Sequence, residues 1–138
     1  MNNRQIKFRT WDKEYKEFSE WTNRDPFFST SHGQIFFWER VHREDDSYGG
    51  DIILQDNNDR FILQQFTGLL DAEGREIYEG DLVKVNLHDP EIGEVIFNNG
   101  GFRMQSKSFK GTFLGIVTSG FLIKVAGNIF EDSELLKP

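Results

Sequence analysis

The chain has 138 residues, a formal net charge of −7, 14 phenylalanines and no cysteine. This length suits a domain with a real hydrophobic core, and the many aromatic rings favour β-sheet over helix. The lack of cysteine excludes disulfide bonds, thiol nucleophiles and cysteine-ligated zinc. The negative charge argues against a nucleic-acid binder whose whole surface is basic, although it allows a local basic face.

The N-terminal part is predicted to contain short strands. Residues 6–11 alternate apolar and polar side chains, as a half-buried strand does, and residues 15–21 form a second candidate. Residues 35–38 include Phe36, Phe37 and Trp38, so this predicted strand carries large rings on both faces. Either both faces are buried, or one of them is an interface with a second copy of the chain or another protein.

The middle of the chain is divided by charged and turn-forming residues. Residues 43–51 hold three consecutive acidic residues and a Gly-Gly pair, which predicts a loop. Residues 52–54 and 61–63 are apolar and flank a polar, asparagine-containing run. This pattern predicts a β-hairpin between them.

Two turns and a strand meander are predicted toward the C-terminus. Gly74 and Gly80 stand in the turns, residues 82–87, 93–97 and 102–105 form strands, and Asn99-Gly100 predicts a type I′ hairpin. Residues 113–117 and 121–125 complete five strands, and residues 132–136 form one helical turn. We expect these residues to be buried: Val83, Val85, Val95, Phe97, Phe102 and Ile123. We expect these to be exposed: Lys84, Asn86, Glu94 and Arg103.

Together these patterns predict a mostly β protein with minimal helix. Residues 69–138 are expected to form an SH3-like small barrel, and residues 1–68 an N-terminal β arm that joins it in one compact unit. The N-terminus has no apolar signal-peptide core, and no run of 18 apolar residues occurs. We therefore expect a cytoplasmic protein without a membrane partner.

Three segments carry a resemblance to a known family: IKFRTWD at residues 6–12, TGLLDAEGREIYEGD at residues 67–81 and GNIFED at residues 127–132. In these segments the chain resembles the YopX-like proteins of bacteriophages and prophages, with Thr10 in place of a small residue. The resemblance implies an accessory protein of the host-cell cytoplasm, not an enzyme, that binds a host or phage protein. A homo-oligomer is compatible with it.

Acidic residues gather in the second of these segments. Glu76, Glu79 and Asp81 have the chemistry of a metal site or an acid–base pair. However, aspartate in a turn commonly accepts backbone N–H bonds, so the structural interpretation is favoured. The three histidines have no metal-site spacing, and no serine lies in a nucleophile-elbow motif. No catalytic residue, metal or cofactor is therefore assigned, and a metal-dependent hydrolase around Glu79, Asp81 and His88 ranks third among the hypotheses.

Cations and aromatic rings alternate in the C-terminal half. Between Val95 and Phe130 there is no acidic residue, a pattern typical of single-stranded nucleic-acid binding on a small barrel. This is the alternative to protein binding. The competing interpretation is that the rings face inward and the cations form a solvated face, with Phe109 either stacking on a base or plugging the barrel. The candidate surface for nucleic acid or a partner consists of Arg103, Lys107, Phe109, Lys110 and Lys124.

Overall fold

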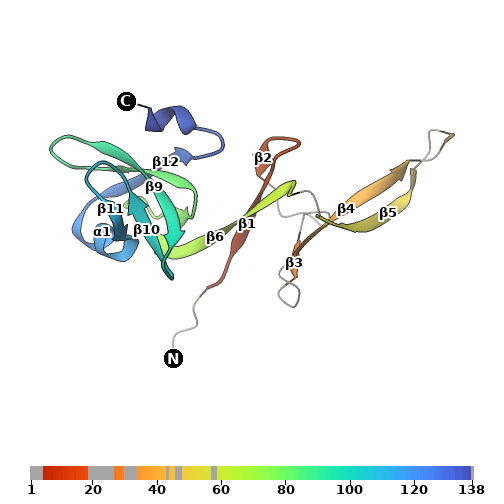
Figure 1. The fold of residues 1–138 in the computed structure, drawn as a ribbon, viewed down its shortest axis with the longest axis horizontal. Coiled ribbons are helices and arrows are strands. Elements are labelled where there is room, and N and C mark those ends of the chain that lie inside the picture. Colours follow the sequence, from red (N-terminus) through yellow and green to blue (C-terminus); the bar gives the residue numbers. More distant parts are fainter. Residues whose placement is uncertain are drawn as a thin grey trace. The chain divides into compact units, whose positions relative to one another are not determined.

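The computed structural model describes residues 5–18, 27–29, 34–42, 44–45, 48–56 and 59–137. It contains two compact units, one formed by Met1–Phe8 and Gln64–Pro138 and the other by Arg9–Leu63. Within the described ranges, strands dominate and the only helices are α1 (Leu114–Gly120) and the 3₁₀ turn η1 (Ser133–Leu136) (Figure 1). The prediction of a mostly β protein with minimal helix is confirmed.

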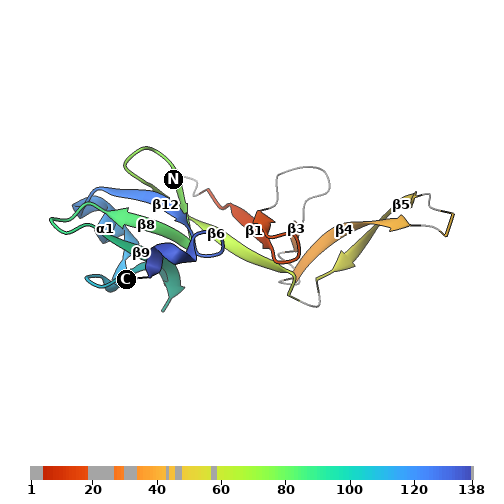
Figure 2. The same ribbon diagram turned by 90° about the horizontal axis from the view of Figure 1, so that it is seen from above.

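The first unit contains a five-stranded antiparallel sheet with the order β11-β10-β9-β8-β12. Its strands are β8 (Asp81–Val85), β9 (Glu91–Asn98), β10 (Gly101–Gln105), β11 (Lys110–Phe113) and β12 (Ile123–Asn128). The first four strands form a meander, and α1 then leads the chain to β12, which pairs with β8 (Figure 2). The sheet curls, and its concave face holds the core.

The core of this unit follows the predicted alternation. Val83 and Val85 are fully buried on either side of the exposed Lys84, and Asn86 is exposed as well. The remaining core side chains come from β7 (Glu76–Tyr78), from the other strands and from α1. The core consists of Ile77, Val83, Val85, Val95, Met104, Leu114, Val117 and Ile123. The predicted register is therefore confirmed along β8.

Three side chains near the β9–β10 hairpin depart from the prediction. Phe97 is 55% exposed, whereas the alternation predicted a buried ring. It lies at the end of β9, beyond the layer of core residues, where it meets the half-buried Phe102 edge-to-face at 5.2 Å. Glu94 and Arg103 are half-buried, not exposed. The hairpin itself is confirmed, because Asn99 and Gly100 have φ values of 49° and 78°.

Residues 113–117 were predicted to form a strand, and this prediction is wrong. After Phe113 the chain enters α1, in which Leu114 and Val117 are buried. A spacing of three positions places both side chains on one face of a helix, so burial on the core selects helix over the intrinsic preference of the β-branched residues. The predicted C-terminal turn is present as η1.

Four further strands have the order β2-β1-β6-β7. They include β1 (Phe8–Asp12), β2 (Glu17–Phe18) and β6 (Phe61–Leu70). Within the first unit, β6 pairs with β7 through Phe66 and Tyr78. Within the second, Trp11 of β1 pairs with Phe18 of β2. The predicted strand at residues 15–21 is confirmed only at Glu17–Phe18, since residues 13–16 form a turn and residues 19–21 lie outside the described part.

The second unit also contains a three-stranded sheet, with the order β3-β4-β5. Its strands are β3 (Phe27–Ser29), β4 (Gln34–His42) and β5 (Tyr48–Gln55). The hairpin predicted for residues 52–63 is wrong, because β5 pairs with β4. The loop predicted for residues 43–51 is also shorter than expected, because Tyr48–Asp51 belong to β5. Of the aromatic strand, Phe36 and Phe37 are half-buried.

Asp56 directly follows β5 and binds the start of β6. Its carboxylate accepts hydrogen bonds from the backbone N–H groups of Arg60 (2.9 Å) and Phe61 (2.8 Å). These bonds connect the residue after β5 to the start of β6, while β5 takes its hydrogen-bonding partner from the nine-residue β4.

Glycine substitutions test the two predicted turns. Gly74 and Gly80 both have positive φ (83° and 84°), but a Cβ at Gly80 would lie 2.0 Å from Gln64 Nε2, whereas one at Gly74 meets nothing within 4 Å. We expect Gly74→Ala to lower the free energy of unfolding by ~1 kcal/mol through backbone strain alone. Gly80→Ala should cost ~2–4 kcal/mol, because it also displaces a buried, hydrogen-bonded amide. Denaturant unfolding measures both, and equal losses would contradict the Gln64 contact.

Candidate functional site

Asp71, in the second resemblance segment, is a buried hydrogen-bond acceptor. Its Oδ1 accepts the N–H groups of Glu73 (2.9 Å) and Arg75 (2.8 Å), and its Oδ2 accepts the N–H of Val125 (2.9 Å). The side chain is 7% exposed. The N–H of Ala72 donates to the carbonyl of Ile123 at 2.9 Å. The 71–75 turn is therefore bound to the outer edge of β12.

The environment of Asp71 favours its charged form. Burial, the largest single influence, raises its pKa, but the N–H donors of Val125, Arg75 and Glu73 and the Arg75 guanidinium act in the opposite direction. Together they hold the pKa of Asp71 below its ordinary value. The folded state thus contains an ionised carboxylate whose oxygens are occupied by backbone donors.

A hydrogen bond between Asp81 and Asn128 connects the second resemblance segment to the third. Asp81 Oδ2 accepts the N–H of Tyr78 at 2.8 Å, and Asp81 Oδ1 lies 3.4 Å from Asn128 Nδ2. The same Nδ2 donates to Gln64 Oε1 at 3.3 Å, and Asn128 Oδ1 accepts the N–H of Phe130 at 3.0 Å. All three side chains of this network are buried. Its donors and acceptors serve folding.

The other acidic residues of the segment are engaged as well. Glu79 Oε1 accepts the N–H of Gln65 at 2.9 Å, and Glu76 forms an ion pair with Lys7 and accepts a bond from the Tyr78 hydroxyl. His88 is exposed. Among the residues that the structure describes, no group of three His, Asp or Glu side chains can hold a metal ion. These hydrogen bonds are the contacts that the structural interpretation of the carboxylates predicts.

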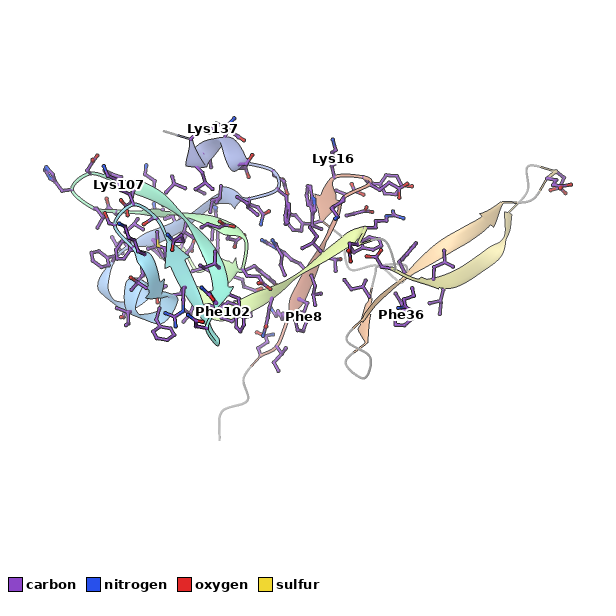
Figure 3. All side chains as sticks on the ribbon, viewed as in Figure 1. Phe8, Lys16, Phe36, Phe102, Lys107 and Lys137 are labelled. Carbon is purple, nitrogen blue, oxygen red and sulfur yellow. The ribbon has the colours of Figure 1, made fainter. Side chains whose placement is uncertain are left out.

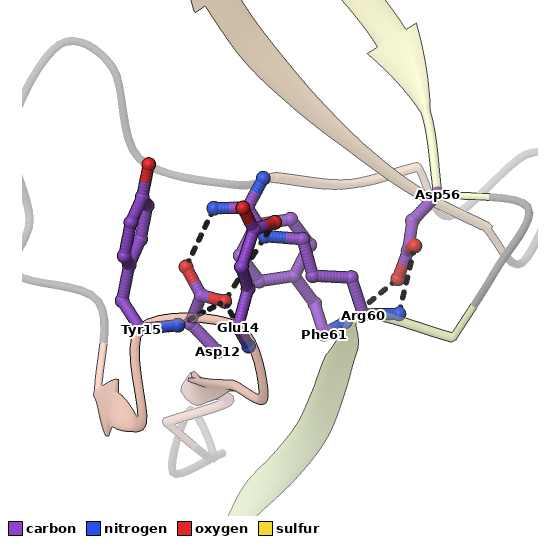
Figure 4. Close-up of polar contacts among 6 residues, drawn as sticks. All are labelled: Asp12, Glu14, Tyr15, Asp56, Arg60 and Phe61. Carbon is purple, nitrogen blue, oxygen red and sulfur yellow. Dashed lines mark hydrogen bonds and ion pairs between the residues drawn. The ribbon is translucent and has the colours of Figure 1, made fainter.

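A second polar cluster, within the other unit, surrounds Arg60 (Figure 4). Its guanidinium binds Asp12 with two parallel bonds, Nε to Oδ1 at 3.0 Å and Nη2 to Oδ2 at 2.9 Å, and Glu14 lies 3.2 Å from Nε. Asp12 also accepts the N–H groups of Glu14 and Tyr15. Burial opposes ionisation of Asp12, but the Arg60 bonds and these amides lower its pKa overall. This bidentate ion pair connects β1 to the start of β6 within the second unit.

The predicted basic and aromatic surface is only partly available. Arg103 donates to the carbonyls of Asn98 (2.9 Å) and Gly111 (2.8 Å), and its guanidinium lies 4.0 Å from the centre of the Phe113 ring. Lys124 pairs with Glu73 at 3.2 Å. Phe109 packs against the core and meets Phe121 edge-to-face at 5.3 Å. These contacts favour a packing role for Phe109 over a role in stacking on a nucleic-acid base.

Lys107 and Lys110 remain exposed, but an acidic residue lies beside Lys107. Glu91 accepts bonds from the hydroxyls of Ser106 (2.7 Å) and Ser108 (2.9 Å), on either side of Lys107. These bonds, with the positive charge of Lys107 nearby, lower the pKa of Glu91. Lys107 stands at the opposite end of β10 from Phe102 (Figure 3). Residues 95–130 contain no Asp or Glu, but in the folded chain the carboxylate of Glu91 lies next to this surface.

Exposed apolar side chains gather in the chain around α1. Ile116 and Leu122 are each 61% exposed, and Phe121 between them in sequence is 40% exposed. We call these three residues the α1 patch. No charged residue occurs from Gly111 to Ile123, although 28% of the whole chain is charged. Sequence analysis missed this patch because it assigned residues 113–117 and 121–125 to strands.

A second feature is an open groove near the β9–β10 hairpin. It has a volume of about 560 Å³ and is lined by the following residues: Gln65, Thr67, Gly68, Phe97, Gly100, Gly101 and Phe102. None of these side chains is charged. The exposed Phe97 ring forms part of its wall, and the hydroxyl of Thr67 donates to the carbonyl of Ile77 at 2.7 Å.

Comparison with known proteins shows the family and similar folds. The family model described as YopX protein matches residues 7–137, and the chain therefore belongs to the YopX family. The fold is similar to the crystal structure of protein EF1440 from Enterococcus faecalis, with a TM-score of 0.65 and 26% sequence identity over 98% of this chain and all of that one (100%). It is also similar to the crystal structure of protein yopX from Bacillus subtilis, with a TM-score of 0.63 and 20% identity over the same shares, 98% and 100%.

A search of curated proteins finds no match. Within the described residues, no helix combines the length and the apolar character needed to cross a membrane.

Replacing Asp71 by asparagine tests the role of its charge. The amide retains one acceptor but turns an NH₂ group toward a backbone donor, so we expect the free energy of unfolding to fall by ~1.5–3 kcal/mol at pH 7. Because the folded-state pKa lies below the ordinary value, the stabilisation is present above about pH 4 and is lost as pH falls through the lowered pKa.

The difference between wild type and Asp71→Asn should therefore shrink on acidification below about pH 4. Chemical denaturation at several pH values measures it, with Asp89→Asn at an exposed aspartate as the control. A stability loss that is independent of pH would show that the charge contributes nothing.

Proposed function

We propose that this chain is a non-catalytic phage or prophage accessory protein that acts in the host cytoplasm by binding a host or phage protein through the α1 patch. The observation that carries the proposal is the exposure of Ile116, Phe121 and Leu122 on a unit whose core is already filled by other side chains. Apolar side chains in an uncharged stretch have the composition of the centre of a protein interface.

The state of the acidic residues supports the non-catalytic part of the proposal. A general acid or base needs a free oxygen directed at a substrate, whereas the oxygens of Asp71 and Asp81 are engaged with backbone N–H groups and with Asn128. Glu79 is bound to the backbone of Gln65. In this proposal the second resemblance segment stabilises the fold, and the recognition surface consists of other residues.

Nucleic-acid binding is the alternative, and its support is the exposure of Lys107 and Lys110. Against it stand the engaged Arg103, the packed Phe109 and the carboxylate of Glu91 between two serines. Phosphate contacts would make binding of a single-stranded oligonucleotide weaken steeply with salt. A titration at low salt without association, on single and double strands alike, excludes this alternative.

Substitutions in the α1 patch test protein binding. We expect Ile116→Ser with Leu122→Ser to leave the melting temperature nearly unchanged, because both side chains are exposed, and to weaken partner capture from host or phage-infected lysate by at least about tenfold. Quantitative mass spectrometry after cross-linking measures the loss.

Leu70→Ser is the matched control, since Leu70 is a 53% exposed apolar residue on β6, outside the patch. Equal capture by wild type, patch variant and control would contradict the proposal. Analytical ultracentrifugation of the wild type, the patch variant and the control also gives the oligomeric state. If the wild type and the control are dimers and the patch variant is a monomer, the patch is a self-association surface.

A further inference from the structure

Strands β8 and β12 bring two lysines together beside the α1 patch. Lys84 pairs directly with Lys124 in the antiparallel register, and the N–H of Asn86 donates to the carbonyl of Leu122 at 2.9 Å. Side chains of directly paired residues project from the same face of a sheet. Accordingly, Lys84, Asn86, Leu122 and Lys124 line a hollow of about 260 Å³. We call it the lysine hollow.

The charge in this hollow is incompletely balanced. Like charges directly opposite each other destabilise a pair of strands, so two facing lysines are unfavourable without a counter-charge. Lys124 has one, the carboxylate of Glu73 at 3.2 Å. For Lys84, no ion pair occurs within the described part of the chain. The hollow thus presents one unbalanced ammonium group, a second one at its edge and the amide of Asn86.

We infer that the lysine hollow binds a carboxylate side chain of the protein partner, next to an apolar side chain that covers Leu122. This inference rests on the proposed function and specifies the partner as a segment in which acidic and apolar residues lie side by side. The ammonium of Lys84 and the amide of Asn86 donate to the carboxylate oxygens, and Leu122 belongs both to the hollow and to the α1 patch.

The uncharged neighbourhood favours a carboxylate over the phosphates of a nucleic acid. A phosphate backbone carries a charge at every nucleotide, whereas residues 111–123 next to the hollow offer no cation to meet it. The apolar side chains of the α1 patch would then stay uncovered or face the charged chain. An acidic and apolar peptide satisfies both parts of the surface.

The test uses a displayed library of random 12-residue peptides, from which peptides that bind the full-length protein are selected. We expect the selected peptides to carry Asp or Glu beside Leu, Ile or Phe. Lys84→Glu should weaken their binding by at least about tenfold. A peptide in which Lys replaces the acidic residue should regain binding to Lys84→Glu, because the charges are exchanged. Lys110→Glu, at an exposed lysine on β11, is the matched control and should change affinity less than about twofold.

The outcomes separate this inference from the proposed function. If substitution of Leu122 weakens peptide binding but substitution of Lys84 does not, the inference is wrong, whereas protein binding at the α1 patch is still supported. A library without any binder that depends on Leu122 counts against both. Binding of a single-stranded oligo-dT that is lost in Lys84→Glu would assign the hollow to phosphate and overturn the carboxylate.

Discussion

The carboxylate of Asp71 closes the open edge of the five-stranded sheet, and the rest of the first unit depends on it. β12 is the last strand in the sheet order, so its outer N–H and C=O groups have no neighbouring strand. Asp71 accepts the N–H of Val125, and the backbone of Ala72 pairs with Ile123. The 71–75 turn, about 50 residues earlier in the chain, thus supplies the hydrogen-bond partners that a neighbouring strand would otherwise give to β12. The buried Asp81–Asn128–Gln64 network additionally connects the end of β12 to β6 and β8.

The hydrogen-bonded acidic turn and the proposed recognition surface consist of different residues of the first unit. In the second resemblance segment, the carboxylates of Asp71 and Asp81 accept backbone N–H bonds. The proposed recognition surface lies instead on α1 and at the start of β12, where apolar residues are exposed and Lys84 faces Lys124. The acidic turn also reaches the lysine hollow, because Glu73 pairs with Lys124. A partner carboxylate in the lysine hollow would compete with Glu73 for this lysine.

Local chemistry was predictable from the sequence, and long-range pairing was not. The positive φ angles at Gly74, Gly80 and Asn99-Gly100 follow from turn composition, and the burial of Val83 and Val85 follows from alternation. The partner of β5 depends on competition between strands, which no local pattern records. Residues 113–117 fit a strand and a helix equally until the core selects the face of Leu114 and Val117. The lysine hollow likewise requires the register of β8 and β12, which only the folded chain supplies.

Amide hydrogen exchange at Val125 tests most directly whether Asp71 closes this edge. If it does, the Val125 N–H should exchange as slowly as the N–H of Val83 in β8, which has a neighbouring strand on each side, although Val125 lies in the last strand of the sheet. The outward N–H groups of β11, at the opposite edge, provide the reference for an open strand. Exchange of Val125 at the rate of those β11 groups would contradict the closing role of Asp71.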